Sequence, residues 1–103
     1  MSEQLVEMDD LALLDGGDLR AVLNQVSEDQ VVDALLGISA GLRRQLLDKL
    51  PQATSGRIER RIDPRDSIPF ETVLDAQRSI IDALCRLSRG AQIAFDLPED
   101  MVA

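Results

Sequence analysis

Apolar residues in this chain recur at helical spacing in a series of short segments, most of which meet a residue that begins or ends a helix. The clearest beginning is Ser27–Gln30, whose Ser-Glu-Asp-Gln sequence has the form of a capping box. Its two acids also suit the positive end of the helix dipole. The helix that follows should turn Val31, Ala34 and Leu35 inward. We expect it to end at Gly37 in the left-handed conformation that is common there.

Similar signals divide the rest of the chain. Asp15 and Ser39 can each cap a helix, and Pro51 can either end one helix or open the next. Pro64 restricts the backbone before it, so the preceding helix should end there. Leu11, Leu13 and Leu14 are expected in a short helical turn, and Leu19, Val22, Leu23 and Val26 follow at helical spacing. The next helices present Leu42, Leu46, Leu47 and Leu50, with Arg43, Arg44 and Lys49 outside, and then Ile58 and Ile62 one turn apart. Pairing of Arg43 and Arg44 with nearby acids also stays open. The last helix has a predicted buried stripe of Val73, Ala76, Ile80, Leu84 and Leu87.

The pattern predicts about six short helices and no paired strands. The longest covers roughly 70–88, and a short extended run is expected at 91–95. Most segments are near ten residues, too short to persist alone in water, so each must be stabilised by packing. A chain of 103 residues suits one modest core. The predicted fold class is therefore all-α, a compact single domain with a short extended segment near the C-terminus.

Composition narrows the classes of function. Aromatic residues make up 2% of the chain, so the core must be built from aliphatic side chains. A net charge of −8 without Trp or Tyr argues against binding nucleic acid. No segment approaches the length of a membrane span, and the N-terminus has no signal-peptide pattern. The single Cys85 excludes an intrachain disulfide and suits a reducing compartment. We expect a soluble, cytoplasmic domain without direct membrane insertion.

The charged residues are unevenly distributed. Residues 1–33 hold nine acids and one base, residues 34–69 hold seven bases and four acids, and residues 70–103 hold six acids and three bases. The basic region centres on 57–62, where Arg57, Arg60 and Arg61 flank Glu59. A basic stretch within an acidic chain is either a solvated outer face or a docking surface, and both interpretations stay open at this point.

The sequence predicts no catalytic residue, metal site or cofactor. The chain has no His, so Cys85 lacks an activating partner and is interpreted as a small buried hydrophobe. Asp9-Asp10 and the acids at 96–100 lack the partners or loop spacing of a metal site, so we interpret them as solvated. Gly16-Gly17 has no strand before it and is interpreted as a turn or a helix start, not a phosphate loop.

Several motifs, taken in order over residues 11–89, resemble the C-terminal domain of the bacterial flagellar motor switch protein FliG. They are Asp18–Val26, Ala34–Gly37 (similar to its Ala-Leu-Lys-Gly signature), Leu42-Arg43 with Leu46-Leu47 and Leu50, Val73 with Ala76-Gln77 and Ile80, and Arg86-Leu87. Leu5, Val6 and Met8 fall where the family has a Met-Phe-x-Phe hinge, although both aromatics are absent. We accordingly divide the chain into a hinge-like segment 1–10, of which residues 1–8 should be frayed, a helical domain 11–95 and an acidic, disordered tail 96–103.

The resemblance implies a rotor component without catalytic chemistry, at the cytoplasmic face of the inner membrane and within a larger ring of switch-complex proteins. In the family, charged side chains on one helix meet opposite charges on the cytoplasmic loop of the stator, and torque is transmitted there. A hinge before the domain helps to reverse rotation. Arg57, Glu59, Arg60 and Arg61 occupy the place of that helix, so they are the expected stator-facing residues.

The charges depart from the family pattern at these positions. The family's Arg-acid-Asp triplet aligns with Glu59-Arg60-Arg61, so all three signs are reversed, and Leu36, Ala53 and Cys85 stand where the family has basic residues. If the helix engages a stator, the stator loop must therefore carry changed charges. The alternative is a FliG-like adaptor or interaction domain that has kept the scaffold without stator contact.

Overall fold

The computed structural model describes residues 6–62 and 68–90. Within these ranges the chain forms a 3-10 helix, η1 (Met8–Leu13), and five α-helices: α1 (Gly16–Leu23), α2 (Glu28–Leu36), α3 (Ala40–Asp48), α4 (Gln52–Arg61) and α5 (Phe70–Arg89). The described residues contain no strand. The predicted all-α fold is confirmed. The residues at the predicted Pro64 stop, the extended run at 91–95 and the tail at 96–103 lie outside the described ranges.

Three helices begin at the side-chain caps that the sequence indicated. In each case the capping oxygen accepts a hydrogen bond from a backbone N–H three residues later, which satisfies one of the unpaired donors at a helix start. The caps are Asp15 on Asp18 at 2.8 Å, Ser27 on Gln30 at 3.2 Å and Ser39 on Leu42 at 3.1 Å. Gln30 also accepts from the Ser27 N–H, so the capping box is confirmed. Pro51 immediately precedes α4 and therefore opens a helix.

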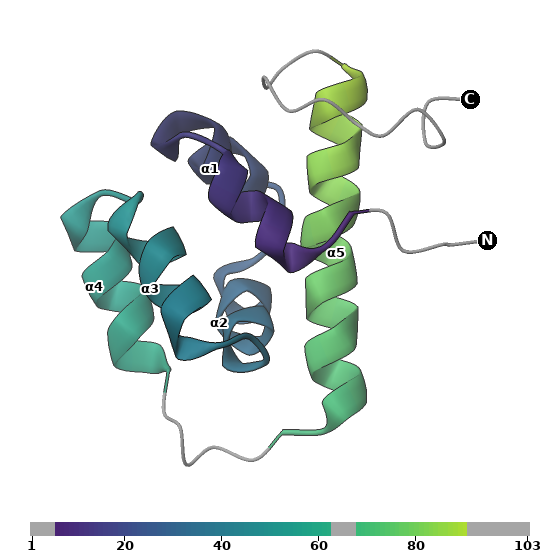
Figure 1. Cartoon of the computed structure of the whole chain (residues 1–103). Coiled ribbons are helices and arrows are strands. Elements are labelled where there is room, and N and C mark those ends of the chain that lie inside the picture. The colour runs from purple at the N-terminus through teal and green to yellow at the C-terminus, as the bar shows by residue number, and fades with distance from the viewer. Residues whose placement is uncertain (1–5, 63–67, 91–103) are drawn as a thin grey trace.

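Helix α5 forms one side of the molecule (Figure 1). Helices α1 and α2 pack against it, whereas α4 lies on the far side and contacts α2 and α3. The predicted inward stripe of α5 is confirmed and also includes Ala83 and Cys85. Among the described residues every buried side chain is aliphatic or sulfur-containing, as the scarcity of aromatics required. The core thus takes buried side chains from η1 and from all five α-helices.

The N-terminal segment is more ordered than we expected. Residues 1–8 were expected to be frayed, but Val6 is 2% exposed and Met8 is 6% exposed, and both belong to the core. Asp10 accepts a hydrogen bond from the Glu7 N–H at 2.8 Å, which fixes the start of η1. The expectation was wrong for residues 6–8 because it was based on their position near the N-terminus, whereas the side chains of Val6 and Met8 reach the core. Leu5 lies outside the described residues.

Gly37 ends α2, but not in the left-handed conformation predicted for it. Its φ is −95°, a value open to any residue. A Cβ at this position would lie 2.4 Å from Val73 Cγ1 and 2.8 Å from Gln77 Nε2. Glycine is therefore needed because α5 passes close to the end of α2. Gln77 also donates from Nε2 to the Ala34 carbonyl at 3.1 Å. This hydrogen bond supplies a donor for a carbonyl near the C-terminus of α2.

Two cations that were predicted to lie outside are instead partly buried. Lys49 donates from Nζ to the carbonyls of Ala12 and Leu14, the latter at 2.6 Å. Arg43 donates from Nε to the Leu35 carbonyl at 3.2 Å and from Nη2 to the Ile38 carbonyl at 3.4 Å. The carbonyls at a helix end lack intrahelical partners, and these side chains supply donors for them. Arg44, as predicted, is exposed.

Candidate functional site

Helix α4 carries all four of the predicted stator-facing residues. Of its side chains only Ile58 is buried, and Ile62, just beyond the helix, packs partly against the core. Arg60 and Arg61 lie in the last turn, where cations interact favourably with the negative end of the helix dipole. The helix is therefore held on its inner side by the buried Ile58 and the partly buried Ile62, which leaves most of its surface to polar and charged side chains.

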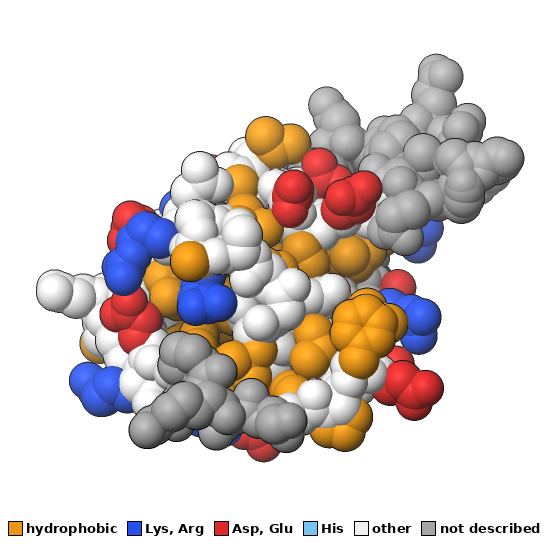
Figure 2. All heavy atoms as spheres, turned by 60° about the horizontal axis from the view of Figure 1, so that its bottom comes forward, with side chains coloured by type: hydrophobic (Ala, Val, Ile, Leu, Met, Phe, Trp, Pro, Cys, Tyr) orange, Lys and Arg blue, Asp and Glu red, His pale blue; other side chains and the backbone are white. Residues whose placement is uncertain are grey.

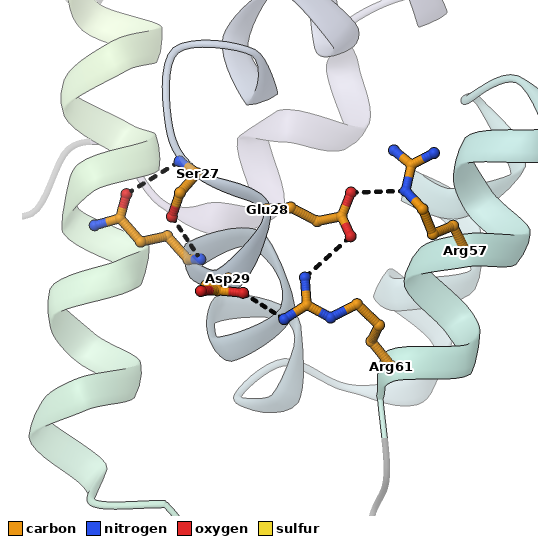
Figure 3. Close-up of polar contacts among 6 residues, drawn as sticks. Ser27, Glu28, Asp29, Arg57 and Arg61 are labelled. Atoms are coloured by element: carbon orange, nitrogen blue, oxygen red, sulfur yellow. Dashed lines mark hydrogen bonds and ion pairs between the residues drawn. The ribbon is translucent and has the colours of Figure 1, made fainter.

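Arg57 and Arg61 point toward the N-terminus of α2 (Figure 3). Arg57 Nε donates to Glu28 Oε1 at 2.8 Å, Arg61 Nη1 donates to Glu28 Oε2 at 3.0 Å, and Arg61 Nη2 pairs with Asp29. We call Glu28, Asp29, Arg57 and Arg61 the α2–α4 cluster. Both acids lie in the first turn of α2, where the helix dipole also favours negative charge.

The α2–α4 cluster stabilises the charged forms of its members. Hydrogen bonds from Arg57 and then Arg61 lower the pKa of Glu28 below the usual range for glutamate. The hydrogen bond from Arg61 to Asp29, followed by the one to Glu28, raises the pKa of Arg61. These side chains remain accessible to water, with Arg57 54% exposed and Arg61 40% exposed, so salt should weaken the cluster.

The lowered pKa of Glu28 predicts a pH-dependent contribution to stability. A carboxylate whose pKa is lower in the folded state stabilises the fold fully above its unfolded pKa of about 4.3, and this contribution is lost as the pH falls through the folded value. Relative to wild type, Glu28→Gln should therefore have a lower Tm at pH 6 and a shrinking deficit as the pH falls below about 4. Thermal unfolding followed by circular dichroism, at pH 6 and at a series of pH values below about 4, measures the difference.

Glu71→Gln is the matched control for this prediction, because Glu71 is an exposed acid in the first turn of α5. The substitution removes the same charge from the first turn of a helix without removing either arginine contact. We expect a smaller loss of Tm at pH 6 than for Glu28→Gln. A deficit for Glu28→Gln that stays constant with pH, or that equals the deficit for Glu71→Gln, would contradict the prediction.

Glu59 faces α3. Arg44 Nη2 donates to Glu59 Oε2 at 2.7 Å, and Arg44 Nη1 donates to Asp48 at 3.4 Å. The charge of Glu59, followed by the hydrogen bond and charge of Asp48, raises the pKa of Arg44. Glu59 thus balances a cation of the neighbouring helix.

Arg60 differs from the other three candidates because it takes no part in the ion pairs with α2 or α3. It is exposed and makes no ion pair with another described residue. A Cβ on Gly56, one turn earlier, would lie 3.8 Å from Arg60 Nη1, so the guanidinium lies back over the helix surface at that glycine. The four predicted residues therefore do not form one surface. Arg57 and Arg61 face α2, Glu59 faces α3, and Arg60 faces solvent.

The particular partners in these ion pairs were not identified by the sequence argument. Glu28 and Asp29 were assigned only to the helix dipole of α2, whereas Arg44 was interpreted either as an outer-face cation or as a partner of nearby acids. Helical spacing does place Arg57 and Arg61 one turn apart on a common side of α4, which is a signal for a shared partner. The identity of that partner depends on how α2 packs, which local spacing does not reveal.

Cys85 and the glycine pair Gly16-Gly17 agree with their structural interpretations. Cys85 is buried, and burial is the main cause that raises the pKa of its thiol. Gly16 and Gly17 begin α1. Within residues 6–62 and 68–90 no group of three or more Asp, Glu, Cys or His is placed to hold a metal ion. None of the described helices is both long and apolar enough to cross a membrane.

The described residues form a small all-helical domain, and helix α4 presents charged side chains on its surface. The model of the FliG C-terminal domain family matches residues 1–95, and the chain belongs to this family. The match extends beyond the motifs at 11–89 at both ends. No curated protein matches the chain. The family is a structural motor-switch domain and not an enzyme family, so it implies a component of the flagellar motor switch that interacts with other motor components.

Proposed function

We propose that this domain transmits torque in the flagellar rotor through contacts between α4 and an acidic segment of the stator's cytoplasmic loop, at the cytoplasmic face of the inner membrane. The single observation that carries this proposal is Arg60, an exposed cation on α4 that no described residue neutralises. The stator segment must be acidic because Arg60 replaces an acid of the family pattern. Exposed ion pairs are weak and screened by salt, which suits a contact that forms and breaks repeatedly.

The other three candidates are less available for a stator contact than Arg60. Arg57, Glu59 and Arg61 have ion-pair partners within the domain, so a stator loop must displace those partners before it can bind them. Arg60 needs no such exchange. We therefore assign the main stator contact to Arg60 and a supporting role to the exposed sides of Arg57 and Arg61.

The hinge proposal needs a similar refinement. Val6 and Met8 are buried in the same core as α5, so a bend at either residue would pull an apolar side chain out of that core. Both residues should therefore move with the domain as a rigid body. The resemblance alone supports a role for Leu5, Val6 and Met8 in reversing rotation.

The decisive experiment is charge reversal at Arg60. In motile cells that carry this domain in the rotor, Arg60→Glu should reduce swimming to near that of a strain without a working motor, because the contact becomes repulsive. Arg60→Lys should retain most of the swimming, since the charge is kept. Swimming in soft agar and the rotation of tethered cells measure the effect. Unchanged swimming of Arg60→Glu would overturn the proposal.

A matched control separates torque from stability. Glu28→Gln weakens two contacts of the α2–α4 cluster without altering any residue of α4. It should lower the Tm of the purified domain, whereas Arg60→Glu should leave the Tm and the helical circular dichroism signal nearly unchanged. A swimming defect in Glu28→Gln that is as severe as that in Arg60→Glu, at equal protein levels, would point to unfolding as the cause.

The adaptor function remains a second candidate because one observation favours it. Three of the four charged candidates on α4 are already satisfied inside the domain, as expected if no stator loop competes for them. A pull-down with the stator loop as a peptide, at low and high salt, distinguishes the two. Binding at low salt that is lost at high salt supports the rotor function, and absent or salt-insensitive binding supports the adaptor.

A further inference from the structure

Helix α4 contains a glycine that packing does not require. Gly56 lies in the middle of the helix, and a Cβ there would lie 3.8 Å from Arg60 Nη1, an ordinary van der Waals distance. At Gly16 and Gly37, by contrast, a Cβ would come within 3 Å of a neighbouring atom. A glycine inside a helix makes the helix about fivefold less favourable than an alanine does. Gly56 therefore weakens α4 at a position where no close contact demands a glycine.

The beginning of α4 is also weakly stabilised. Helices α1, α2 and α3 each start with a side-chain cap, whereas Pro51, the N-cap of α4, makes no side-chain hydrogen bond and the first turn of α4 holds no acid. Thr54 and Ser55, which precede Gly56, have lower helix propensities than alanine. Helix α5 also follows a proline, but it buries seven residues and α4 buries one. Helix α4 therefore depends on its contacts with α2 and α3.

The contact between α4 and α2 is incompletely packed. A pocket of about 100 Å³ lies there, with Glu28 and Arg57 in its lining. The apolar part of the lining comes from Leu23, Val26, Val31, Leu50 and Ile58. Side chains that border an empty space lose van der Waals contacts on that side. Because Ile58 is the buried residue of α4, separation of α4 from α2 breaks fewer contacts than it would in a closely packed interface.

Ion pairs supply much of the remaining attachment. Arg57 and Arg61 pair with acids of α2, and Glu59 pairs with Arg44 of α3. Figure 2 shows basic and acidic side chains next to one another on the side of the molecule that α4 occupies in Figure 1. Exposed ion pairs each contribute little and are screened by salt. The attachment of α4 should therefore depend on ionic strength.

We propose that α4 is a releasable helix, which detaches from α2 and α3 as one unit while the rest of the described domain stays folded, and that salt favours its release. Release separates Arg57 and Arg61 from Glu28 and Asp29, so it makes two more cations available to an external acidic group. Release requires no stator and does not rest on the proposed torque function. A domain whose α4 never detaches would still show the swimming defect of Arg60→Glu, so the two proposals fail separately.

Native-state hydrogen exchange of the full chain, followed residue by residue by NMR, tests the release. After correction for intrinsic exchange rates, the amides from Ser55 to Ile62 should share one protection factor, about tenfold or more below that of amides in the middle of α5. Raising NaCl from about 0.05 M to about 1 M should lower the protection of α4 by about threefold or more. Equal protection of α4 and α5, protection that decreases stepwise toward the ends of α4, or the absence of a salt effect would each overturn the proposal.

The origin of the salt effect is tested by Glu28→Gln, which weakens two of the contacts between α2 and α4. It should lower the protection of α4 by about threefold at low salt and reduce the response to NaCl. Glu71→Gln is the matched control, because it removes an exposed acid from α5 and should leave both quantities unchanged for α4. An undiminished salt response in Glu28→Gln would overturn the proposal.

A pair of glycine variants separates release of α4 from unfolding of the whole domain. Gly56→Ala should raise the protection of α4 by about fivefold. Gly41→Ala is the matched control, because Gly41 is the second residue of α3 and a Cβ there has no atom within 4 Å. It should leave the protection of α4 unchanged, since α3 stays folded when α4 detaches. An equal rise for α4 in both variants, or no rise in Gly56→Ala, would overturn the proposal.

Discussion

Leu84→Ala is expected to lower the free energy of unfolding by about 2–5 kcal/mol. Leu84 has no exposed surface and lies on the buried stripe of α5, so its truncation leaves a cavity among side chains of several helices. The loss is large against the roughly 5–15 kcal/mol that stabilises a small domain. Urea unfolding followed by circular dichroism at the helical band measures the change.

Leu13→Ala is the matched control for this substitution. It removes the same atoms from a side chain that is 74% exposed, so we expect a change within about 0.5 kcal/mol. If the two variants lost similar stability, the cost would lie in helix propensity or in the unfolded state, and the assignment of Leu84 to the centre of the core would be wrong.

Gly16→Ala should be the most damaging single-methyl addition among the described glycines. A Cβ at Gly16 would lie 2.5 Å from the backbone oxygen of Lys49. A backbone atom cannot move aside as a flexible side chain can, so α1 and the end of α3 must separate. We expect a loss of about 1–3 kcal/mol of unfolding free energy, measured by chemical denaturation.

The neighbouring glycine provides the control. At Gly17 the nearest atom to a new Cβ would be Asp15 Oδ1 at 3.6 Å, an ordinary contact. Gly17→Ala should therefore be neutral or should stabilise the domain by up to about 1 kcal/mol, because alanine has less backbone freedom to lose. A loss at Gly17 equal to that at Gly16 would contradict the close approach of α1 and α3.

Local signals in the sequence were sufficient to predict the helices. The caps at Asp15, Ser27 and Ser39 act over three residues of chain, and the inward stripe of α5 follows from helical spacing. By contrast, the backbone conformation of Gly37 and the exposure of Lys49 were predicted wrongly. Their roles depend on α5 and on η1, which are distant in sequence, and a propensity rule cannot supply those neighbours.

The charged helix was predictable from the sequence, but the arrangement of its side chains was not. Its role as the stator-facing site stays a proposal. The sequence could not show that Arg57 and Arg61 would be occupied by acids about 30 residues away, or that Glu59 would be occupied by Arg44. These pairs form only after α2, α3 and α4 have packed, so Arg60 could be distinguished from its neighbours only in the folded structure.

Helix α4 is attached to the domain by fewer buried side chains than α5, so the two helices should differ in stiffness. One buried side chain, Ile58, and a set of ion pairs open to water hold this helix, whereas α5 contributes seven buried residues to the core. Regions with few buried contacts open at low free-energy cost and re-form easily. A load applied to α4 would therefore be absorbed first by elastic yielding at the boundary with α2. If α4 carries the proposed stator contact, the domain would yield where it is pushed and stay rigid in the core around α5.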